Sequence, residues 1–461
     1  MPFPSPQASS FRFLGAGAAL SLILLTFLLF GRSSHFGLGG EDSAAGYVLK
    51  SSSCSDVPHA QPETDVEFSA DSQAGGEEWV FDVQRDGDNH GLSGEQCLAA
   101  FPKLFGEIDS VAEARKEKPI TFREVDELAI KGGADENGNG IVRAMILDGE
   151  LYLIQYGPMP YTFSRGKATL HSLHRALAAY PDRKNLPNIE FVFTTDDFST
   201  GQSPVWSYSK QATEEDKGVW LMPDFGYWSW PEVKVGSYKE VRRRIAEVDD
   251  GSFSPSSNNG RPENGLKFHD KKKQLLWRGS VTANPEIRGA LLRASRGKSW
   301  ASMREIVWAN PAPNILPMED HCQYMFLAHT EGRSFSGRGK YLLNCRSVVI
   351  SHKLQWIEAH HGALISSGPD ANYVEVNRDF SDLEHKLEFL LDNPEAAERI
   401  AENAVRTFRD RYLTPAAESC YWRHLVRRYG EVSAFEPVLY EKSGKEWVKR
   451  GVHFESWVLE V

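Results

Sequence analysis

Apolar and polar positions along this chain switch repeatedly between period-two and helical spacing, which predicts alternating strands and helices. The most informative stretch reads as an apolar run, a Gly/Ser/Arg loop, a short helix and a second apolar run, over residues 324–330, 331–339, 340–344 and 347–351. Strand, loop, helix, strand is the order of a nucleotide-binding βαβ unit. The stretch therefore predicts an anion site suited to a diphosphate. The alternative is a Gly-rich turn with surface arginines.

The same alternation continues on both sides of this stretch. It predicts helices over 98–117, 167–180, 238–248, 286–293, 383–392 and 394–412, and strands over 143–147, 151–156, 189–195, 274–277 and 373–376. Asp148-Gly149 between two alternating runs is a hairpin signal. Ser381 is the expected N-cap of the helix that starts at Leu383. Strands and helices alternate in both halves, so we expect an α/β fold.

Near the N-terminus an uncharged apolar run, residues 13–30, lies between Arg12 and Arg32. The run is long enough for a spanning helix, and the residues after it make a poor cleavage site, so we expect a signal anchor over the alternative of a cleaved signal peptide. A stem rich in Ser, Gly and acidic residues follows this run, and a turn-rich break at 252–265 separates two larger parts of the chain. The expected parts are a cytoplasmic tail (1–12), a transmembrane anchor (13–30), a disordered stem (31–76), an N-terminal Rossmann-like domain (77–260), a C-terminal Rossmann-like domain (261–430) and a tail (431–461).

Composition narrows the class of partner. With 461 residues the chain exceeds one typical core, and its net charge of −11 argues against a nucleic-acid partner. The basic clusters at 242–244 and 271–273 have acidic neighbours and read as solvated faces. The five cysteines lack metal-finger spacing; in a secretory protein one or two disulfides and one spare thiol are expected, with connectivity left open.

Two groups of residues could form further parts of a site. Arg278 and Ser280 follow a strand and Arg288 lies on the next helix, which favours a second anion clamp; a buried ion pair is the alternative. Asp196-Asp197 ends a buried strand, where a carboxylate can act as a general base. An Asx turn, a helix N-cap or metal binding remain alternatives for this pair.

An aromatic loop, residues 223–231, would form either a platform for a sugar or base, or a packed surface loop. Evidence for a metal is weak. The segment from Asp135 imitates an EF-hand loop but has Ile146 at its twelfth position. His360-His361 does not indicate a metal site on its own. We therefore assign no metal residue and no cofactor, and Mn²⁺ stays open without a D-x-D motif to support it.

Five segments in order carry a family resemblance: LPNIEFVFTTDDF, PDFGYWSWPE, LLWRGS with NPEIR, DHCQYMFLAHTEGRSFSGRGKYLLNCRSVVISH, and YVEVNRDFSDLEHKLEFLLDNPEAAERIAENA. From Arg165 to Tyr429 the chain resembles glycosyltransferase family 90, which includes fungal capsule-associated xylosyltransferases and animal protein O-glucosyltransferases. The resemblance implies a GT-B fold, in which two Rossmann-like domains face a cleft. It also implies transfer of xylose or glucose from a UDP-sugar donor to a hydroxyl of a glycan or glycoprotein acceptor.

The resemblance also implies roles for residues that match the family's motifs. Asp197 would be the base of an inverting displacement, and Tyr227 and Trp228 would wall the cleft. Donor binding would fall to Arg278, Ser280, Arg288, Ser336, Arg338 and Lys340.

Two departures from the animal enzymes stand out. Arg333 and Gly337 replace apolar residues, and no retention tetrapeptide ends the chain. We therefore expect a fungal-type, single-pass type II protein of the Golgi or ER membrane with a lumenal catalytic body. A non-catalytic secretory relative that binds a sugar or nucleotide is the main alternative, and a phosphate-ligand enzyme of another class is the weaker one.

Overall fold

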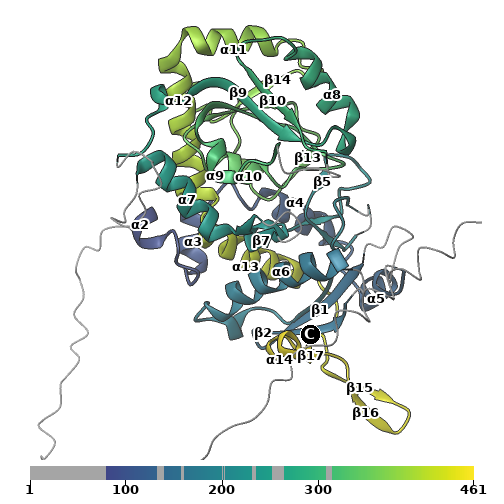
Figure 1. The fold of residues 1–461 in the computed structure, drawn as a ribbon. Coiled ribbons are helices and arrows are strands. Elements are labelled where there is room, and N and C mark those ends of the chain that lie inside the picture. The colour runs from purple at the N-terminus through teal and green to yellow at the C-terminus, as the bar shows by residue number, and fades with distance from the viewer. Residues whose placement is uncertain are drawn as a thin grey trace, which may run out of the picture. The chain divides into compact units, whose positions relative to one another are not determined.

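Two β-sheets organise the described part of the chain (Figure 1). The computed structural model describes residues 79–131, 140–156, 160–199, 201, 203–230, 235–251, 264–307 and 314–460. The first sheet has the strand order β17-β2-β1-β3-β4-β6 and the second the order β10-β9-β11-β12-β14. The strands of the first are β1 (Ile141–Leu147), β2 (Glu150–Gln155), β3 (Ile189–Thr194), β4 (Trp206–Ser207), β6 (Trp220–Leu221) and β17 (Val452–His453). Those of the second are β9 (Lys272–Gly279), β10 (Ala301–Glu305), β11 (Tyr324–His329), β12 (Val348–His352) and β14 (Val374–Val376).

Helices surround both sheets. Those of the first part are α2 (Val83–Asp86), α3 (Gly94–Ala100), α4 (Gly106–Arg115), α5 (Phe122–Lys131), α6 (Pro160–Ala178) and α7 (Tyr238–Asp250). Those that follow are α8 (Pro285–Ala294), α9 (Met318–His321), α10 (Gly339–Leu342), α11 (Leu383–Asp392), α12 (Pro394–Ala404), a π-helical continuation (Val405–Tyr412), α13 (Pro415–Glu431) and α14 (Phe454–Glu460). Short two-stranded pairs are formed by β5 (Lys210–Gln211) with β13 (Trp356–Ile357), β7 (Ser229–Trp230) with β8 (Gly236–Ser237), and β15 (Tyr440–Ser443) with β16 (Glu446–Lys449).

The first sheet is mixed. β1 runs antiparallel to both β2 and β3, whereas β3, β4 and β6 are parallel. The predicted hairpin is confirmed: Asp148 and Gly149 both have positive φ, at 51° and 77°, the conformation that a two-residue hairpin turn requires. Every residue of β3 is buried, as its unbroken apolar run predicts, so the chain leaves this strand at Asp196 and Asp197 from the centre of the sheet.

The second sheet is parallel throughout. When its strands are numbered 1 to 5 along the chain, they lie side by side in the order 2-1-3-4-5, one of the two common doubly wound orders. The order reverses between β9 and β11, and ligands of such sheets bind beyond the carboxyl ends of the strands at this point. The predicted α/β class with parallel strands is confirmed, and β9 and β11 are the strands that should lead into a site.

Helix α13 returns to the first sheet after the second is complete, and packs against α6, α4 and α3. A disulfide between Cys97 of α3 and Cys420 of α13 fixes this return, and Cys322–Cys345 forms a second disulfide. The described residues belong to one compact unit. The sequence-based division at 260 and 430 stays a prediction.

Two local predictions are wrong. The helix expected over 98–117 is two helices, because Phe101 leaves the helical conformation (φ −129°, ψ 48°) before Pro102, whose ring disfavours it there. At the start of α11 the N-cap position is held by Asp382, not Ser381. The side chain of Ser381 instead accepts a hydrogen bond from Asn377 Nδ2.

Several predictions concern segments that the structure does not describe: the anchor at 13–30, the stem, the EF-hand-like turn from Asp135 and most of the break at 252–265. Cys54 also lies outside the described residues. Within the described ranges, none of the helices is both long and apolar enough to span a bilayer.

Candidate active site

A cavity of about 620 Å³ opens at the carboxyl ends of β9 and β11, the position that the strand order predicts. Its lining includes two carboxylate residues, Asp197 and Glu319. Six arginines line it: Arg165, Arg244, Arg278, Arg288, Arg333 and Arg338. Positive charge therefore exceeds negative charge in the lining, and an anionic ligand would complement it.

Three of these arginines are held in place through backbone carbonyls. Arg278 Nη1 donates to the carbonyls of Trp277 and Ser302 at 2.8 and 2.5 Å. Arg288 Nε donates to the Glu331 carbonyl at 3.0 Å. Arg338 Nη1 donates to the carbonyl of Arg278.

No carboxylate within the described ranges forms an ion pair with Arg278, Arg288 or Arg338, and the buried Nε of Arg338 has no hydrogen-bond partner there. Buried charges are ordinarily paired, so this cluster lacks the anion that such cations require.

The lowered pKa values of two of these arginines agree with the lack of a paired anion. Burial lowers the pKa of Arg288 to about 10. Burial, together with the neighbouring charges of Arg288 and Arg278, lowers the pKa of Arg338 to about 10 as well. Both guanidinium groups stay charged at neutral pH, and a bound diphosphate would offset their mutual repulsion.

Helix α10, which follows the loop, has only four residues. So short a helix carries little dipole and adds little to anion binding. Ser336 does line the cavity, and its carbonyl accepts from Gly339 N–H at 2.9 Å. Ser280 also lines it, with its hydroxyl 2.8 Å from Thr282 Oγ1. The arginines and hydroxyls supply the donors here.

Asp197 follows strand β3 of the first sheet and lies across the same cavity from the arginine cluster. Its Oδ1 forms an ion pair of 2.9 Å with Arg165 Nη1, and its side chain is 33% exposed, enough for an acceptor to reach it. Ser334 Oγ donates to the Asp197 carbonyl at 2.5 Å, which joins the arginine loop to the end of β3.

The carboxylate of the neighbouring residue, Asp196, bonds to the adjacent backbone. Asp196 Oδ1 accepts from the Asp197 N–H at 2.6 Å. Along the described chain the next elements after this pair are the short strands β4 and β5, so the N-cap alternative does not apply.

Three predicted site residues do not line the cavity. Lys340 is fully buried and its Nζ lies 2.8 Å from both carboxylate oxygens of Asp224, so it anchors the loop beneath the cavity. Tyr227 is 5% exposed and packs against Tyr238 in the core. Trp228 stacks on His171 with ring centroids 4.9 Å apart. The lining aromatics are instead Phe225, Trp230 and Phe335.

The lining also contains polar residues that were not among the predicted site residues, including Arg165, Arg244, Glu319 and His321. Burial and the nearby charge of Arg338 lower the pKa of His321 to about 3, so its ring is neutral. Its Nδ1 lies 2.9 Å from the Pro317 carbonyl, whereas Nε2 has no partner among the described residues. His321 thus presents a polar ring nitrogen beside the arginines. Its place shortly before β11 is the one signal that could have suggested it.

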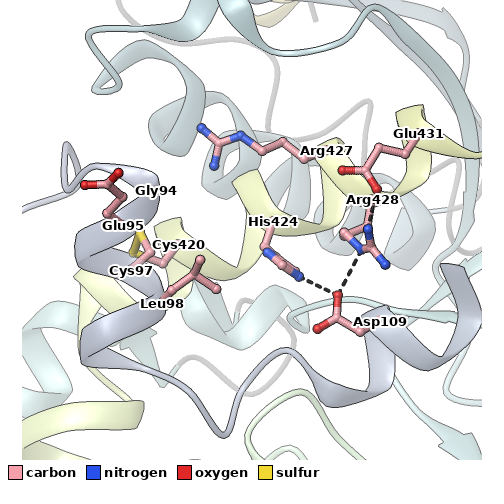
Figure 2. Close-up of a pocket in the computed structure, with 10 residues that line it drawn as sticks. All are labelled: Gly94, Glu95, Cys97, Leu98, Asp109, Cys420, His424, Arg427, Arg428 and Glu431. Atoms are coloured by element: carbon pink, nitrogen blue, oxygen red, sulfur yellow. Dashed lines mark hydrogen bonds and ion pairs between the residues drawn. A yellow bond between two sulfur atoms is a disulfide. The ribbon is translucent and has the colours of Figure 1, made fainter. Parts of the chain in front are cut away.

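A second cavity, of about 420 Å³, lies beside the Cys97–Cys420 disulfide (Figure 2). In this cavity Asp109 Oδ1 lies 2.8 Å from His424 Nε2 and 2.9 Å from Arg428 Nε. Arg428 therefore has a carboxylate partner in this cavity, unlike Arg278, Arg288 and Arg338 in the first one.

A cationic cavity at the switch point of a parallel sheet, lined also by the carboxylates of Asp197 and Glu319, is suited to a phosphorylated ligand and to proton transfer beside it. The family model described as glycosyl transferase family 90 matches residues 129–450. The chain belongs to this family, and the prediction of a glycosyltransferase is confirmed.

The names of curated relatives agree with this family assignment. An "O-glucosyltransferase rumi homolog" of Aedes aegypti is 23% identical over 87% of this chain and 94% of its own length. The "Protein O-glucosyltransferase 1" of Homo sapiens is 24% identical over 59% of this chain and 68% of its own length. The "O-glucosyltransferase rumi" of Drosophila melanogaster is 25% identical over 54% and 62%, respectively.

Proposed function

We propose that this enzyme transfers a sugar from a UDP-sugar to an acceptor hydroxyl with inversion, and that the arginine cavity holds the donor diphosphate. The observation that carries the proposal is the cluster of Arg278, Arg288 and Arg338, which lacks a carboxylate partner among the described residues and shares its cavity with Asp197. The parallel sheet and the mixed sheet would be the two halves of a GT-B fold, with the donor mainly on the parallel one.

In the proposed reaction the Asp197 carboxylate takes the proton of the acceptor hydroxyl as the oxygen attacks the anomeric carbon. The bond between that carbon and the β-phosphate oxygen breaks, and UDP leaves with the electron pair. The base and the leaving group must lie on opposite faces of the sugar, which two opposed walls of one cavity allow. Arginines at the departing diphosphate would stabilise the charge that develops there.

The relatives are named for O-glucosyl transfer, two of them for the rumi protein and one for a protein substrate. These names support glucose as the sugar and a protein hydroxyl as the acceptor. Xylose, and a glycan hydroxyl, are the other pair that the family resemblance implies. The second candidate function is a non-catalytic relative that binds UDP or its sugar.

The test is release of UDP from UDP-glucose and UDP-xylose by the purified full chain, with and without Mn²⁺. The acceptor panel should contain folded peptide modules and mannose oligosaccharides, and the anomeric configuration of the product should be determined. Acceptor-dependent UDP release with inversion supports the proposal. Binding of UDP without turnover would favour the binding relative, and failure to bind UDP would point to another class of phosphorylated ligand.

We also propose that residues 13–30 anchor the enzyme as a single-pass type II protein with its catalytic body in the ER or Golgi lumen. The two disulfides support an oxidising compartment. Carbonate extraction and protease protection of intact microsomes test this proposal. Release by carbonate, or digestion of the catalytic body without detergent, would contradict it.

A further inference from the structure

The turn after β13 gathers three metal-ligating side chains outside the arginine cavity: Glu358, His360 and His361. The His361 N–H donates to the Glu358 carbonyl at 2.9 Å, so the turn brings residues of positions i and i+3 together. The two imidazole rings lie with centroids 4.7 Å apart and planes at 84°. One ligand atom from each of the three residues lies within 4.8 Å of the other two.

Glu358 and His360 are buried and His361 is half-buried, and several of their ligand atoms have no hydrogen-bond partner within the described part of the protein. Glu358 is 3% exposed, and neither of its carboxylate oxygens has a hydrogen-bond partner there. His360 is 1% exposed and its Nε2 likewise has none among the described residues. The nearest ring nitrogen to the carboxylate is His361 Nε2, which lies 3.3 Å from Oε2.

The neighbouring ammonium does not complete this site. Lys340 is bound to both oxygens of Asp224. A buried ionised carboxylate is unfavourable unless it is paired or coordinates a metal, so a bound cation would stabilise the ionised form of Glu358.

The donor set identifies the kind of ion. Two imidazoles and one carboxylate are a ligand combination that Zn²⁺ accepts, with bonds of about 2.0–2.2 Å. Ligand atoms around such an ion lie at most about 4 Å apart, so small side-chain rotations would close the observed cluster.

The surroundings of the rings fit the same ion. Tyr227 Oη lies 3.5 Å from His360 Nδ1, on the side where ligating histidines usually have an oxygen partner. A space of about 10 Å³, no larger than one water, is lined by both rings but not by Glu358.

We propose that Glu358, His360 and His361 bind one Zn²⁺ ion. The turn that carries them follows β13, and β13 pairs with β5 through Trp356 and Gln211. Strand β5 follows Asp197 in the chain, and β13 follows the parallel strand β12. A bound ion would therefore stabilise the place where a chain segment between strands of the first sheet pairs with one between strands of the second. The site does not depend on the proposed transfer reaction.

The test uses the purified full chain without a histidine tag. After dialysis against metal-free buffer, its zinc content is measured by mass spectrometry and its affinity for added Zn²⁺ by competition with a chelator. We expect one zinc per chain, a zinc-dependent rise in Tm, and a visible absorption band when Co²⁺ replaces zinc. Glu358→Gln and His361→Gln should weaken zinc binding at least about tenfold. His385→Gln, on the exposed face of α11, should leave it unchanged.

Failure of the wild-type chain to retain zinc, to shift in Tm with zinc or to show a Co²⁺ band would overturn the proposal. So would a Glu358→Gln variant that binds zinc like wild type. If the variants do not fold, the zinc and cobalt titrations of the wild-type chain decide the question alone. Thermal stabilisation by UDP, measured in the same preparations, keeps this result separate from that of the transfer reaction.

Discussion

Arg165 Nη1 lies 2.9 Å from Asp197 Oδ1, and the same arginine donates to the Thr195 carbonyl at 3.2 Å. One guanidinium therefore holds both the carboxylate and the strand end that carries it. The Arg165 side chain also lies over the ring of Phe225, 4.8 Å from its centroid, which limits its own movement. Arg165 is a positioning residue for the proposed base.

Replacement of Arg165 by Met should therefore lower kcat about 10- to 100-fold, while KM for the UDP-sugar changes little, because the base loses its orientation and the donor arginines stay in place. Arg165→Lys should restore part of kcat, since it keeps a cation near the carboxylate. Steady-state kinetics on both variants measure this. A rise in KM with unchanged kcat would show that Arg165 serves donor binding.

Arg288 and Arg293 offer a matched pair on α8, since the first lines the cavity and the second is exposed. Arg288→Ala should weaken UDP binding about 10- to 150-fold, which corresponds to a charged hydrogen bond worth about 1.5–3 kcal/mol. Arg293→Ala should bind UDP as wild type does. Calorimetric titration with UDP compares them, and equal affinities would remove Arg288 from the donor site.

The buried pair of Lys340 and Asp224 should stabilise the loop that carries Ser336 and Arg338. Lys340→Met leaves a buried carboxylate without its cation, so the free energy of unfolding should fall by about 3–5 kcal/mol. The double variant Lys340→Met with Asp224→Asn should recover at least about 1 kcal/mol, because the introduced amide carries no charge and its oxygen can still accept from the Gly226 N–H. Urea unfolding measures both. Strictly additive losses would mean that the two side chains do not interact.

His90 should make folding sensitive to acid. Burial, with a smaller contribution from Arg175, lowers its pKa from 6.5 to about 4. Between these values the unfolded chain binds a proton that the folded chain does not, so stability falls as the pH falls from 6.5 to about 4. The slope from this one group approaches about 1.4 kcal/mol per pH unit. His90→Gln should remove that share of the slope in urea unfolding at about pH 7, 6 and 5. An unchanged slope would contradict the assignment.

Much of the fold can be predicted from local sequence, and so can part of the site. Strand β3 and the Asp148-Gly149 turn are set by apolar runs and left-handed turn residues, which act over a few positions. Arg278, Ser280 and Arg288 lie where the strand-to-helix order placed them, because the ends of parallel strands converge on the switch point.

What could not be predicted depends on contacts between distant segments. Lys340 looked like a phosphate ligand because its partner Asp224 lies 116 residues away in the chain. Tyr227 and Trp228 lie in and directly after a 3₁₀ turn, where sequence spacing does not tell which ring faces inward. Glu358 was missed as a neighbour of His360 and His361 because only the turn brings its carboxylate to the rings.

The central claim is that Asp197 is the base in a cavity that binds UDP. Its most direct test compares Asp197→Asn with wild type, using Asp182→Asn at an exposed position as the matched control. The account predicts that Asp197→Asn binds UDP with unchanged affinity but loses at least about 100-fold in acceptor-dependent UDP release, within the range that a general base contributes. Asp182→Asn should retain full turnover. Turnover by Asp197→Asn at the wild-type rate, with UDP bound as tightly, would contradict the account.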